Sequence, residues 1–311
     1  MAVDLSLSIG SAGKQELTLR NPVMVASGTF SNGIEFAKRF DVDALGAICS
    51  KGTTLRPRRG NAQPRTVETA NGMINSIGFQ NIGVGGLIAE IAPIWERWHV
   101  PVLVNIMGET IAEYGQLAER LDGVPGVAGL EVNISCPNVE AGGLEFGQDP
   151  AQAAAVVAEV RRKTGLPFAV KITPAVSDIR PIARAIEDAG GDAITVMNTI
   201  PAMAIDIKRR RPVLATRFGG LSGPAIKPVA LRLVYLTASV TKLPILAAGG
   251  VSSGTDAIEF FMAGASAVQV GTATFRDPET PWRVIREITD WCEEEGVKRL
   301  SDIIGAARPN D

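Results

Sequence analysis

The sequence predicts an α/β protein with a (β/α)8 TIM barrel fold, and three observations carry this prediction. Eight short runs rich in Val, Ile, Leu and Ala alternate with amphipathic segments made of good helix formers. Residues 189–196 and 263–270 share one pattern, a helix end followed by a glycine stop and a buried strand. No low-complexity linker divides the 311 residues, so we expect one barrel domain over residues 1–311. A doubly wound open sheet is the second choice.

The apolar runs are the expected barrel strands, because parallel strands covered on both faces are apolar throughout. They span residues 23–26, 44–49, 102–106, 130–134, 168–172, 193–197, 245–248 and 267–270. Helices are expected at 109–121, 150–163, 178–188 and 255–262. Two alternating runs, 5–9 and 16–19, predict an N-terminal β-hairpin that plugs the barrel. Long loops follow strands 2, 4 and 6, at 51–93, 135–148 and 199–227, and loops of this length are usually functional.

Composition narrows the class of protein. A net charge of −2 gives no electrostatic reason to expect nucleic acid or an anionic membrane as a partner. The longest uncharged run, 69–89, is too polar to span a membrane, and residues 1–10 lack the pattern of a secretory signal. Three cysteines and one histidine are too few for a disulfide framework, an iron–sulfur cluster or a zinc site. We therefore expect a reduced, metal-free, cytoplasmic protein.

The residues at the expected strand ends predict a binding pocket, because the active sites of such barrels lie there. These residues are Ser27, Lys51, Asn105, Asn133, Lys171, Asn198, Gly249-Gly250 and Gly271-Thr272. One polar strand end is most simply a solvated loop, but two lysines and three asparagines at five ends favour a small polar pocket that accepts an anion. Glycines after strands 7 and 8 are typical of a phosphate site. The glycine-rich segment 219–224 could approach the same ligand closely.

Cysteine is the remaining reactive group. Cys49 lies inside an apolar strand and Cys292 in the expected C-terminal helix, so both are expected to be packing residues. Cys136 follows the fourth strand and opens a glycine-rich loop. Most cysteines are inert. However, Lys51 and Lys171 at the same pocket would lower the thiol pKa from about 8.5 toward the range of a general base.

Five motifs together resemble the class 1 dihydroorotate dehydrogenase family. They are Lys51-Gly-Thr-Thr-Leu-Arg-Pro-Arg-Arg-Gly-Asn61, Asn75-Ser-Ile-Gly-Phe-Gln-Asn81, Asn133-Ile-Ser-Cys-Pro-Asn138, Lys171-Ile-Thr-Pro174 and Gly219-Gly-Leu-Ser-Gly-Pro-Ala-Ile-Lys-Pro228. They occur in the family's order, and the Ser-Cys-Pro-Asn and Asn-Ser-Ile-Gly blocks are quite specific. The resemblance implies an FMN-dependent barrel that oxidises (S)-dihydroorotate to orotate in pyrimidine (UMP) biosynthesis.

The resemblance also implies a role for each residue. Cys136 would take a proton from C5 of dihydroorotate while a hydride leaves C6 for flavin N5. The substrate would be held by Lys51, Asn75, Ser76, Ile77, Gly78, Phe79, Asn133, Asn198 and Thr199. FMN would be held by Ser27, Lys51, Gly52, Asn105, Asn133, Lys171, Met197, Gly223, Gly249, Gly250, Gly271 and Thr272, the last four at its phosphate. A cation such as Lys171 near the pyrimidine edge of a flavin stabilises the reduced anion.

The Lys51-Gly-Thr-Thr and Asn75 motifs resemble subclass 1B more than the fumarate-using subclass 1A. Subclass 1B implies a partner subunit that carries FAD and a 2Fe-2S cluster and passes electrons to NAD+. It also implies a homodimer that joins this partner in a heterotetramer. Membrane-bound class 2 is less similar, because it carries serine where Cys136 stands and has an N-terminal extension. Ile200-Pro201-Ala202 departs from the glycine-containing turn of 1B chains.

Other functions stay open on the residues alone. A Schiff-base aldolase or lyase would use Lys171 as its nucleophile. A flavin- or phosphate-binding barrel could serve another subunit as a scaffold without catalysis. A related dihydropyrimidine dehydrogenase would act on substrates that lack the carboxylate, and a class 1A enzyme would use fumarate.

Overall fold

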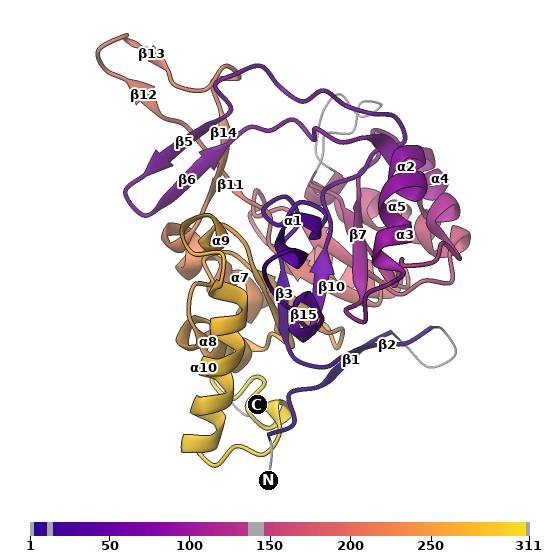
Figure 1. Ribbon diagram of the computed structural model, residues 1–311, viewed down its shortest axis with the longest axis vertical. Helices are drawn as coiled ribbons and strands as arrows, with labels where there is room; N and C mark the ends of the chain where they lie inside the picture. Colours follow the sequence, from indigo (N-terminus) through magenta and orange to yellow (C-terminus); the bar gives the residue numbers. More distant parts are fainter. Residues whose placement is uncertain (1–2, 11–14, 136–145, 309–311) are drawn as a thin grey trace.

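The centre of the protein is a closed barrel of eight parallel strands (Figure 1). The computed structural model describes residues 3–10, 15–135 and 146–308. Around the barrel the strands follow the order β10, β15, β16, β3, β4, β7, β8, β9. Their bounds are β3 Val23–Val25, β4 Ala47–Cys49, β7 Val102–Ile106, β8 Gly129–Asn133, β9 Phe168–Ile172, β10 Ala193–Val196, β15 Ile245–Ala248 and β16 Ala267–Val270. The predicted barrel is confirmed, and the open doubly wound sheet is wrong.

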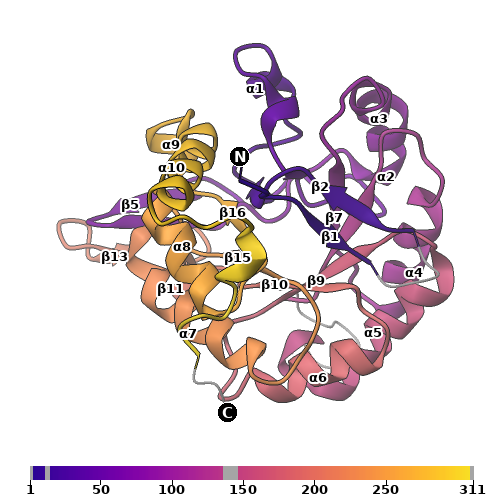
Figure 2. The same ribbon diagram turned by 90° about the horizontal axis from the view of Figure 1, so that it is seen from below.

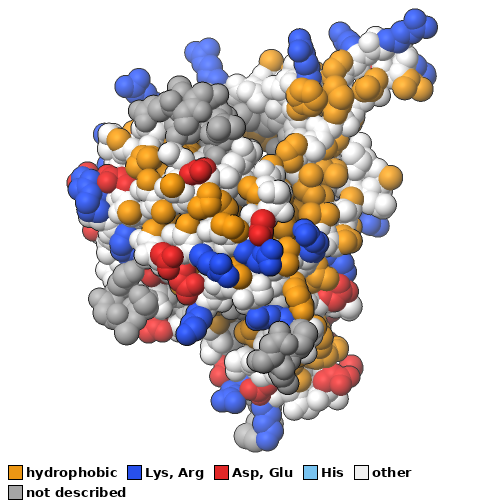
Figure 3. Space-filling view, turned by 180° about the vertical axis from the view of Figure 1, so that it is seen from behind, with side chains coloured by type: hydrophobic (Ala, Val, Ile, Leu, Met, Phe, Trp, Pro, Cys, Tyr) orange, Lys and Arg blue, Asp and Glu red, His pale blue; other side chains and the backbone are white. Residues whose placement is uncertain are grey.

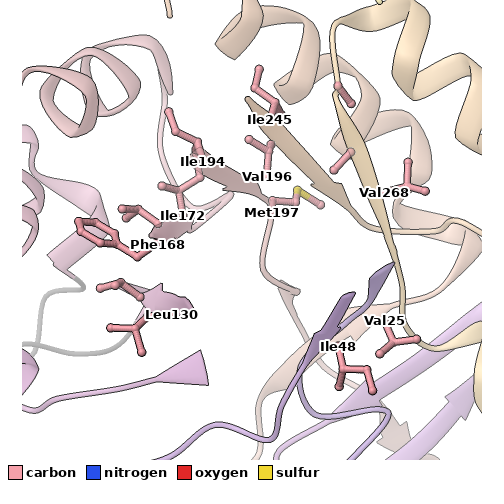
Figure 4. Packing of buried hydrophobic residues seen from close by; sticks show 14 of the residues in the cluster. Val25, Ile48, Leu130, Phe168, Ile172, Ile194, Val196, Met197, Ile245 and Val268 are labelled. Atoms are coloured by element: carbon pink, nitrogen blue, oxygen red, sulfur yellow. The ribbon is translucent and has the colours of Figure 1, made fainter. Parts of the chain in front are cut away.

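The longer helices form a ring outside the barrel. They are α4 Ile111–Leu121, α5 Pro150–Lys163, α6 Arg180–Asp188, α7 Lys227–Ala238, α8 Gly254–Ala263 and α10 Thr280–Glu294. Helix α5 illustrates how the sequence sets where these helices begin and end. Asp149 caps its first turn by accepting from the amide of Gln152, and three basic residues, 161–163, lie in its last turn. Outward-facing strand residues such as Val25, Ile172 and Val268 pack in the main core beneath this ring (Figure 4).

Shorter helical segments complete the ring and the connections. Four are α-helical turns, α1 Ile34–Ala37, α2 Gly83–Gly86, α3 Ala92–Trp95 and α9 Ala273–Arg276. A π-helical turn, Leu87–Ile91, joins α2 to α3. The 3-10 turns span Val42–Ala44, Phe146–Gln148, Pro224–Ile226 and Leu300–Asp302. None of the helices in the described ranges combines the length and the apolar composition that a membrane crossing requires.

An N-terminal hairpin closes the amino-terminal end of the barrel, as predicted (Figure 2). Its strands, β1 Leu7–Ile9 and β2 Leu17–Leu19, pair antiparallel with Leu7 opposite Leu19. The hairpin side chains Ile9, Leu17 and Leu19 are buried in a second core inside the barrel. Their partners there point inward from the strands and include Met24, Cys49, Leu103, Ala169, Ala193, Leu246 and Ala267. The lower barrel interior is therefore packed with apolar side chains.

The long connections after the second and sixth barrel strands form an additional antiparallel sheet, which the sequence did not predict. Its order is β11 Ile200–Ala202, β14 Gly219–Ser222, β6 Gly72–Asn75, β5 Thr66–Thr69. It lies at the opposite end of the molecule from the β1–β2 hairpin (Figure 1). Residues 200–202, which depart in sequence from the glycine-containing turn of subclass 1B chains, form the edge strand β11, and this strand pairs with β14. Most of the fourth connection, 136–145, lies outside the described residues.

A second small hairpin extends from this sheet. Its strands are β12 Ile205–Asp206 and β13 Arg211–Pro212. Ile207 is 83% exposed, and Ile205 and Phe218 are also exposed. Figure 3 shows apolar side chains at this projecting end with several Lys and Arg side chains beside them.

The boundaries of β3, β8 and β10 differ from the prediction by one residue, and the start of β4 differs by three. The expected strand 44–49 begins only at Ala47, because residues 42–44 form a 3-10 turn. The side chain of Asp41 caps that turn by accepting from the amide of Asp43 at 3.1 Å. At Gly46 the backbone runs so close to the carbonyl of Asn21 that a Cβ has no room. The apolar run in the sequence therefore includes a turn before the strand starts.

Candidate active site

A cavity of about 720 Å³ lies at the carboxyl ends of the barrel strands. Its lower wall comes from the ends of the barrel strands, and residues of β6, β11 and β14 form another wall. This volume lies within the range of typical small-molecule sites, about 300–1,000 Å³. The cavity occupies the position that the strand-end argument predicts for a barrel active site.

The structure brings nearly all of the predicted site residues together around this cavity. The lining includes Ser27, Lys51, Gly52, Asn75, Ser76, Ile77, Gly78, Phe79, Asn105, Asn133, Lys171, Met197, Asn198, Thr199, Gly223, Gly249, Gly250, Gly271 and Thr272. Cys136 lies outside the described residues. Its neighbour Ser135 lines the cavity, as does Asn133. Cys49 and Cys292 are fully buried, as expected of packing residues.

At the floor of the cavity, Lys171 and Asn105 contact a carboxylate, that of Glu131, which lies just beneath the floor. The ammonium of Lys171 in β9 lies 3.6 Å from a carboxylate oxygen of Glu131 in β8 and 3.3 Å from the hydroxyl of Ser27. The amide of Asn105 donates to Glu131 at 2.7 Å and reaches Ser27 at 3.3 Å. Burial alone would raise the pKa of Glu131. The Lys171 charge and the hydrogen bonds from its neighbours instead hold that pKa below its ordinary value.

Lys51 provides the second positive charge of the cavity. It follows β4, and its amide donates to the carbonyl of Ser31 at 2.8 Å. Burial lowers the pKa of Lys51 below its ordinary value, and the charge of Arg65 lowers it further. Next to it, Gly52 faces the side chains of Asn105 and Phe79, and a Cβ at Gly52 would lie only 3.0 Å from the Asn105 amide oxygen. A larger residue there would displace groups of the cavity wall.

Residues 75–81 form a turn at the cavity that side-chain hydrogen bonds hold in place. Asn81 donates to the carbonyl of Phe79 and accepts from the amide of Gly83, both at 2.7 Å. The amide of Asn61 donates to the hydroxyl of Ser76 at 2.9 Å. Gly78 has φ +72°, a conformation that favours glycine. The turn therefore presents consecutive residues of one motif to the cavity.

Asn198 and Thr199 reach the same region of the cavity from the sixth strand. They follow β10, and the side chain of Asn198 accepts from the amide of Thr199 at 2.8 Å. Gly220 of β14 faces Thr199 so closely that a Cβ at Gly220 would lie 2.6 Å from the Thr199 Cβ. Gly220 also pairs with Asn75 in the antiparallel sheet. The sheet thus fixes the spacing between two groups of predicted substrate residues.

Glycines dominate another part of the cavity, where the seventh and eighth strands end. Gly249 and Gly250 have φ of +132° and +84°. The segment that follows them is fixed from behind by Asp256, which accepts from the amide and hydroxyl of Ser252 at 2.9 and 2.7 Å. Thr272 donates to the hydroxyl of Ser222 at 2.7 Å. Two strand ends and β14 therefore meet at a wall with little side-chain bulk.

The sequence argument missed the groups beneath the cavity floor and part of its rim. Glu131 and Thr195 are completely buried, and Gln269 lines the cavity from β16. Glu131 could have been found, because a single carboxylate inside the apolar run 130–134 is unusual for a buried strand. The exposed rings of Phe218 and Phe275 line the cavity without any such signal in the sequence.

Comparison with known proteins identifies the family. The profile of the dihydroorotate dehydrogenase family matches residues 13–291. Two relatives are each named "Dihydroorotate dehydrogenase B (NAD(+)), catalytic subunit". The protein of Pelobacter propionicus is 54% identical over 290 residues, covering 93% of this chain and 95% of the relative. That of Geobacter sp. strain M21 is 50% identical over 300 residues, covering 96% and 97%.

The fold also matches a solved structure, that of DHODH from Eimeria tenella in complex with ferulenol. The TM-score is 0.79 at 25% sequence identity, and the match covers 97% of this chain and 89% of that one. The resemblance of the Lys51-Gly-Thr-Thr and Asn75 motifs to subclass 1B agrees with the B-type names of the relatives. The chain belongs to the dihydroorotate dehydrogenase family.

Proposed function

We propose that this chain oxidises (S)-dihydroorotate to orotate in pyrimidine biosynthesis, with FMN bound in the cavity. The observation that carries the proposal is the composition of one cavity of about 720 Å³. Two lysines and three asparagines from different strand ends line it together with glycines at the ends of β15 and β16. Membership of the dihydroorotate dehydrogenase family supports the same reaction.

The chemistry of the lining fits FMN. The flavin ring needs hydrogen-bond partners and gains from a cation, and the proposed partners for the ring are Ser27, Gly52, Asn105, Lys171 and Met197. The phosphate needs backbone amides and little bulk, and the glycine-rich ends at 249–250 and 271–272, with Gly223, meet that need. When bound, FMN accepts the hydride that leaves the substrate.

The substrate is proposed to lie between the turn 75–79 and the pair Asn198-Thr199, with Lys51 and Asn133 completing its site. A cyclic imide with a carboxylate offers donors and acceptors that asparagine amides complement. Cys136 is proposed as the base that removes the proton from C5 while the hydride leaves C6. It lies outside the described residues, and the proposal rests on its place next to Ser135, which lines the cavity.

The electrons are proposed to pass to NAD+ through a partner subunit that carries FAD and a 2Fe-2S cluster. The phrase "catalytic subunit" in the names of the relatives supports such a partner. We further propose a single-domain chain that forms a homodimer, joins the partner in a heterotetramer and works in the cytoplasm. The alternative electron acceptor is fumarate, as in class 1A. An assay that measures dihydroorotate oxidation with each acceptor in turn distinguishes the two.

The proposal is tested by recording the visible spectrum of the purified chain anaerobically, before and after adding dihydroorotate. A yellow protein that bleaches is expected. A yellow protein that bleaches with dihydrouracil instead would point to another dihydropyrimidine, and one that bleaches with neither would point to a scaffold. A colourless protein that does not take up FMN, and that borohydride traps with a carbonyl substrate, would favour the Lys171 aldolase and contradict the proposal.

The role of Cys136 is tested by the variant Cys136→Ala. It should retain FMN while flavin reduction by dihydroorotate slows by orders of magnitude, because a positioned general base contributes about 10²- to 10⁴-fold. Cys292→Ala is the matched control, since Cys292 is buried and is not among the described lining residues. Near-normal reduction in Cys136→Ala would remove this residue from the mechanism.

A further inference from the structure

A single buried carboxylate connects most of the barrel beneath the proposed flavin. One oxygen of Glu131 accepts from Asn105 at 2.7 Å and pairs with Lys171 at 3.6 Å. The other accepts from Gln269 at 2.7 Å and Thr195 at 3.0 Å, with the Cys49 thiol at 3.6 Å. These groups belong to six of the eight barrel strands, β4, β7, β8, β9, β10 and β16. Glu131 has no exposed surface.

The charges of the cavity are unbalanced without this carboxylate. The charged side chains among the described lining residues are Lys51 and Lys171, and no Asp or Glu of the described chain lines the cavity. Glu131 is not itself part of the lining and supplies its negative charge from one layer below. Lys171, Asn105 and Gln269 lie between it and the cavity, since all three contact Glu131 and also line the cavity.

Stability alone is a weak reason for this arrangement. Moving two charges out of water is costly, and apolar replacements of a whole buried ion pair are often neutral or stabilising. A function in the cavity is a stronger reason, because charges act over longer distances where water is excluded. A lone ammonium at a flavin favours the reduced anion, and a carboxylate behind that ammonium offsets part of this effect.

We infer that Glu131 is a positioning residue that orients Lys171 and Asn105 toward the flavin and, by offsetting the Lys171 charge, lowers the reduction potential of the bound FMN. The inference rests on the proposed function, because it requires FMN in this cavity. A lower potential holds the flavin ready to pass electrons onward rather than to retain them. Glu131 touches neither ligand and acts through the two side chains that do.

The test is the midpoint potential of bound FMN in four proteins. In Glu131→Gln, reduction should become at least tenfold more favourable, which for a two-electron couple is about 30 mV. In Lys171→Met the potential should move by a similar amount in the opposite direction. In the double variant both charges are gone. The equilibrium constant for flavin reduction, taken from its midpoint potential, should therefore return to within about threefold of the wild-type value. Thr195→Val is the matched control, since it removes one hydrogen bond to Glu131 and no charge.

The outcomes separate this inference from a merely structural role. A structural role predicts that Glu131→Gln and Thr195→Val both lower the melting temperature while leaving the potential unchanged, and that result would overturn the inference. If Glu131→Gln does not fold, Lys171→Met is compared with the double variant. There the second change should favour reduction by about tenfold, and no difference would overturn the inference. A wild-type chain that does not bind FMN would instead overturn the proposed function.

Discussion

Gly220→Ala should damage the substrate site while leaving the barrel folded. An added Cβ at residue 220 would lie 2.6 Å from the Cβ of Thr199, closer than real Cβ contacts. Rotating the threonine cannot remove this clash, because the Thr199 Cβ itself is too near and its χ1 is stiff. Either the strand β14 or the segment that carries Asn198 and Thr199 must move.

The size of the effect follows from the cost of overpacking, about 1–3 kcal/mol. If that energy is lost from transition-state binding, kcat/KM for dihydroorotate falls by about 5- to 150-fold at 1.36 kcal/mol per decade. The assay is steady-state oxidation of dihydroorotate together with the FMN content of the variant. FMN should be retained, because Gly220 packs against Thr199 rather than against the proposed flavin residues.

The matched control is Gly85→Ala in α2. A Cβ at Gly85 meets no atom within 4 Å, and Gly85 is not a lining residue. Both variants make the same chemical change, so only the surroundings differ. If Gly220→Ala keeps kcat/KM within about twofold of the Gly85→Ala value, the close approach to Thr199 does not position the substrate and the reasoning is refuted.

Three further predictions concern the fold and are each checked by reversible unfolding. Tyr114→Phe should lower the free energy of unfolding by about 1–3 kcal/mol, because it removes the hydrogen bond that the buried hydroxyl donates to the carbonyl of Asn133 at 2.6 Å; an unchanged stability would contradict this. Leu19→Ala should cost about 2–5 kcal/mol and loosen the N-terminal hairpin, because Leu19 is fully buried inside the barrel; a loss below about 1 kcal/mol would mean that the hairpin adds little. Burial raises the pKa of Asp43, but hydrogen bonds from residues 99–100 lower it by more. The pKa of Asp43 in the folded protein is therefore below its ordinary value of 3.8. Its contribution is therefore present above pH 3.8 and is lost as the pH falls through the folded pKa. The stability gap between the wild type and Asp43→Asn should thus narrow on acidification, and a constant gap would exclude this coupling.

The barrel was predictable because burial on both faces leaves a clear pattern in the sequence. The strands β7, β9, β15 and β16 have the bounds expected from their apolar runs, and every residue in them is buried. Helix α5 also has its expected bounds, since Asp149 and Pro150 mark its start. These signals are local, so they can be read without knowing which segments meet.

The antiparallel sheet beside the cavity was not predictable in the same way. The four residues of β14 are two glycines, a leucine and a serine, all partly exposed, and they show neither alternation nor an apolar run. The strand pairs with β6, and the contact between Asn75 and Gly220 joins residues 145 positions apart. Pairing of this kind is fixed by tertiary contacts, and β-propensity alone is a weak guide to it.

The strand-end argument found polar residues that touch the cavity but not the buried layer that supports them, and the geometry of a strand explains why. Side chains alternate along β8, so Glu131 points to the same side as Asn133, toward the barrel axis. The axis therefore passes from the apolar layer around Leu19, through the carboxylate of Glu131, to the cavity. A charged residue two positions before a polar strand end is a pattern that the sequence shows. In a barrel it predicts a buried group that holds the residues of the active site, and Glu131 has the hydrogen-bond partners that such a group requires.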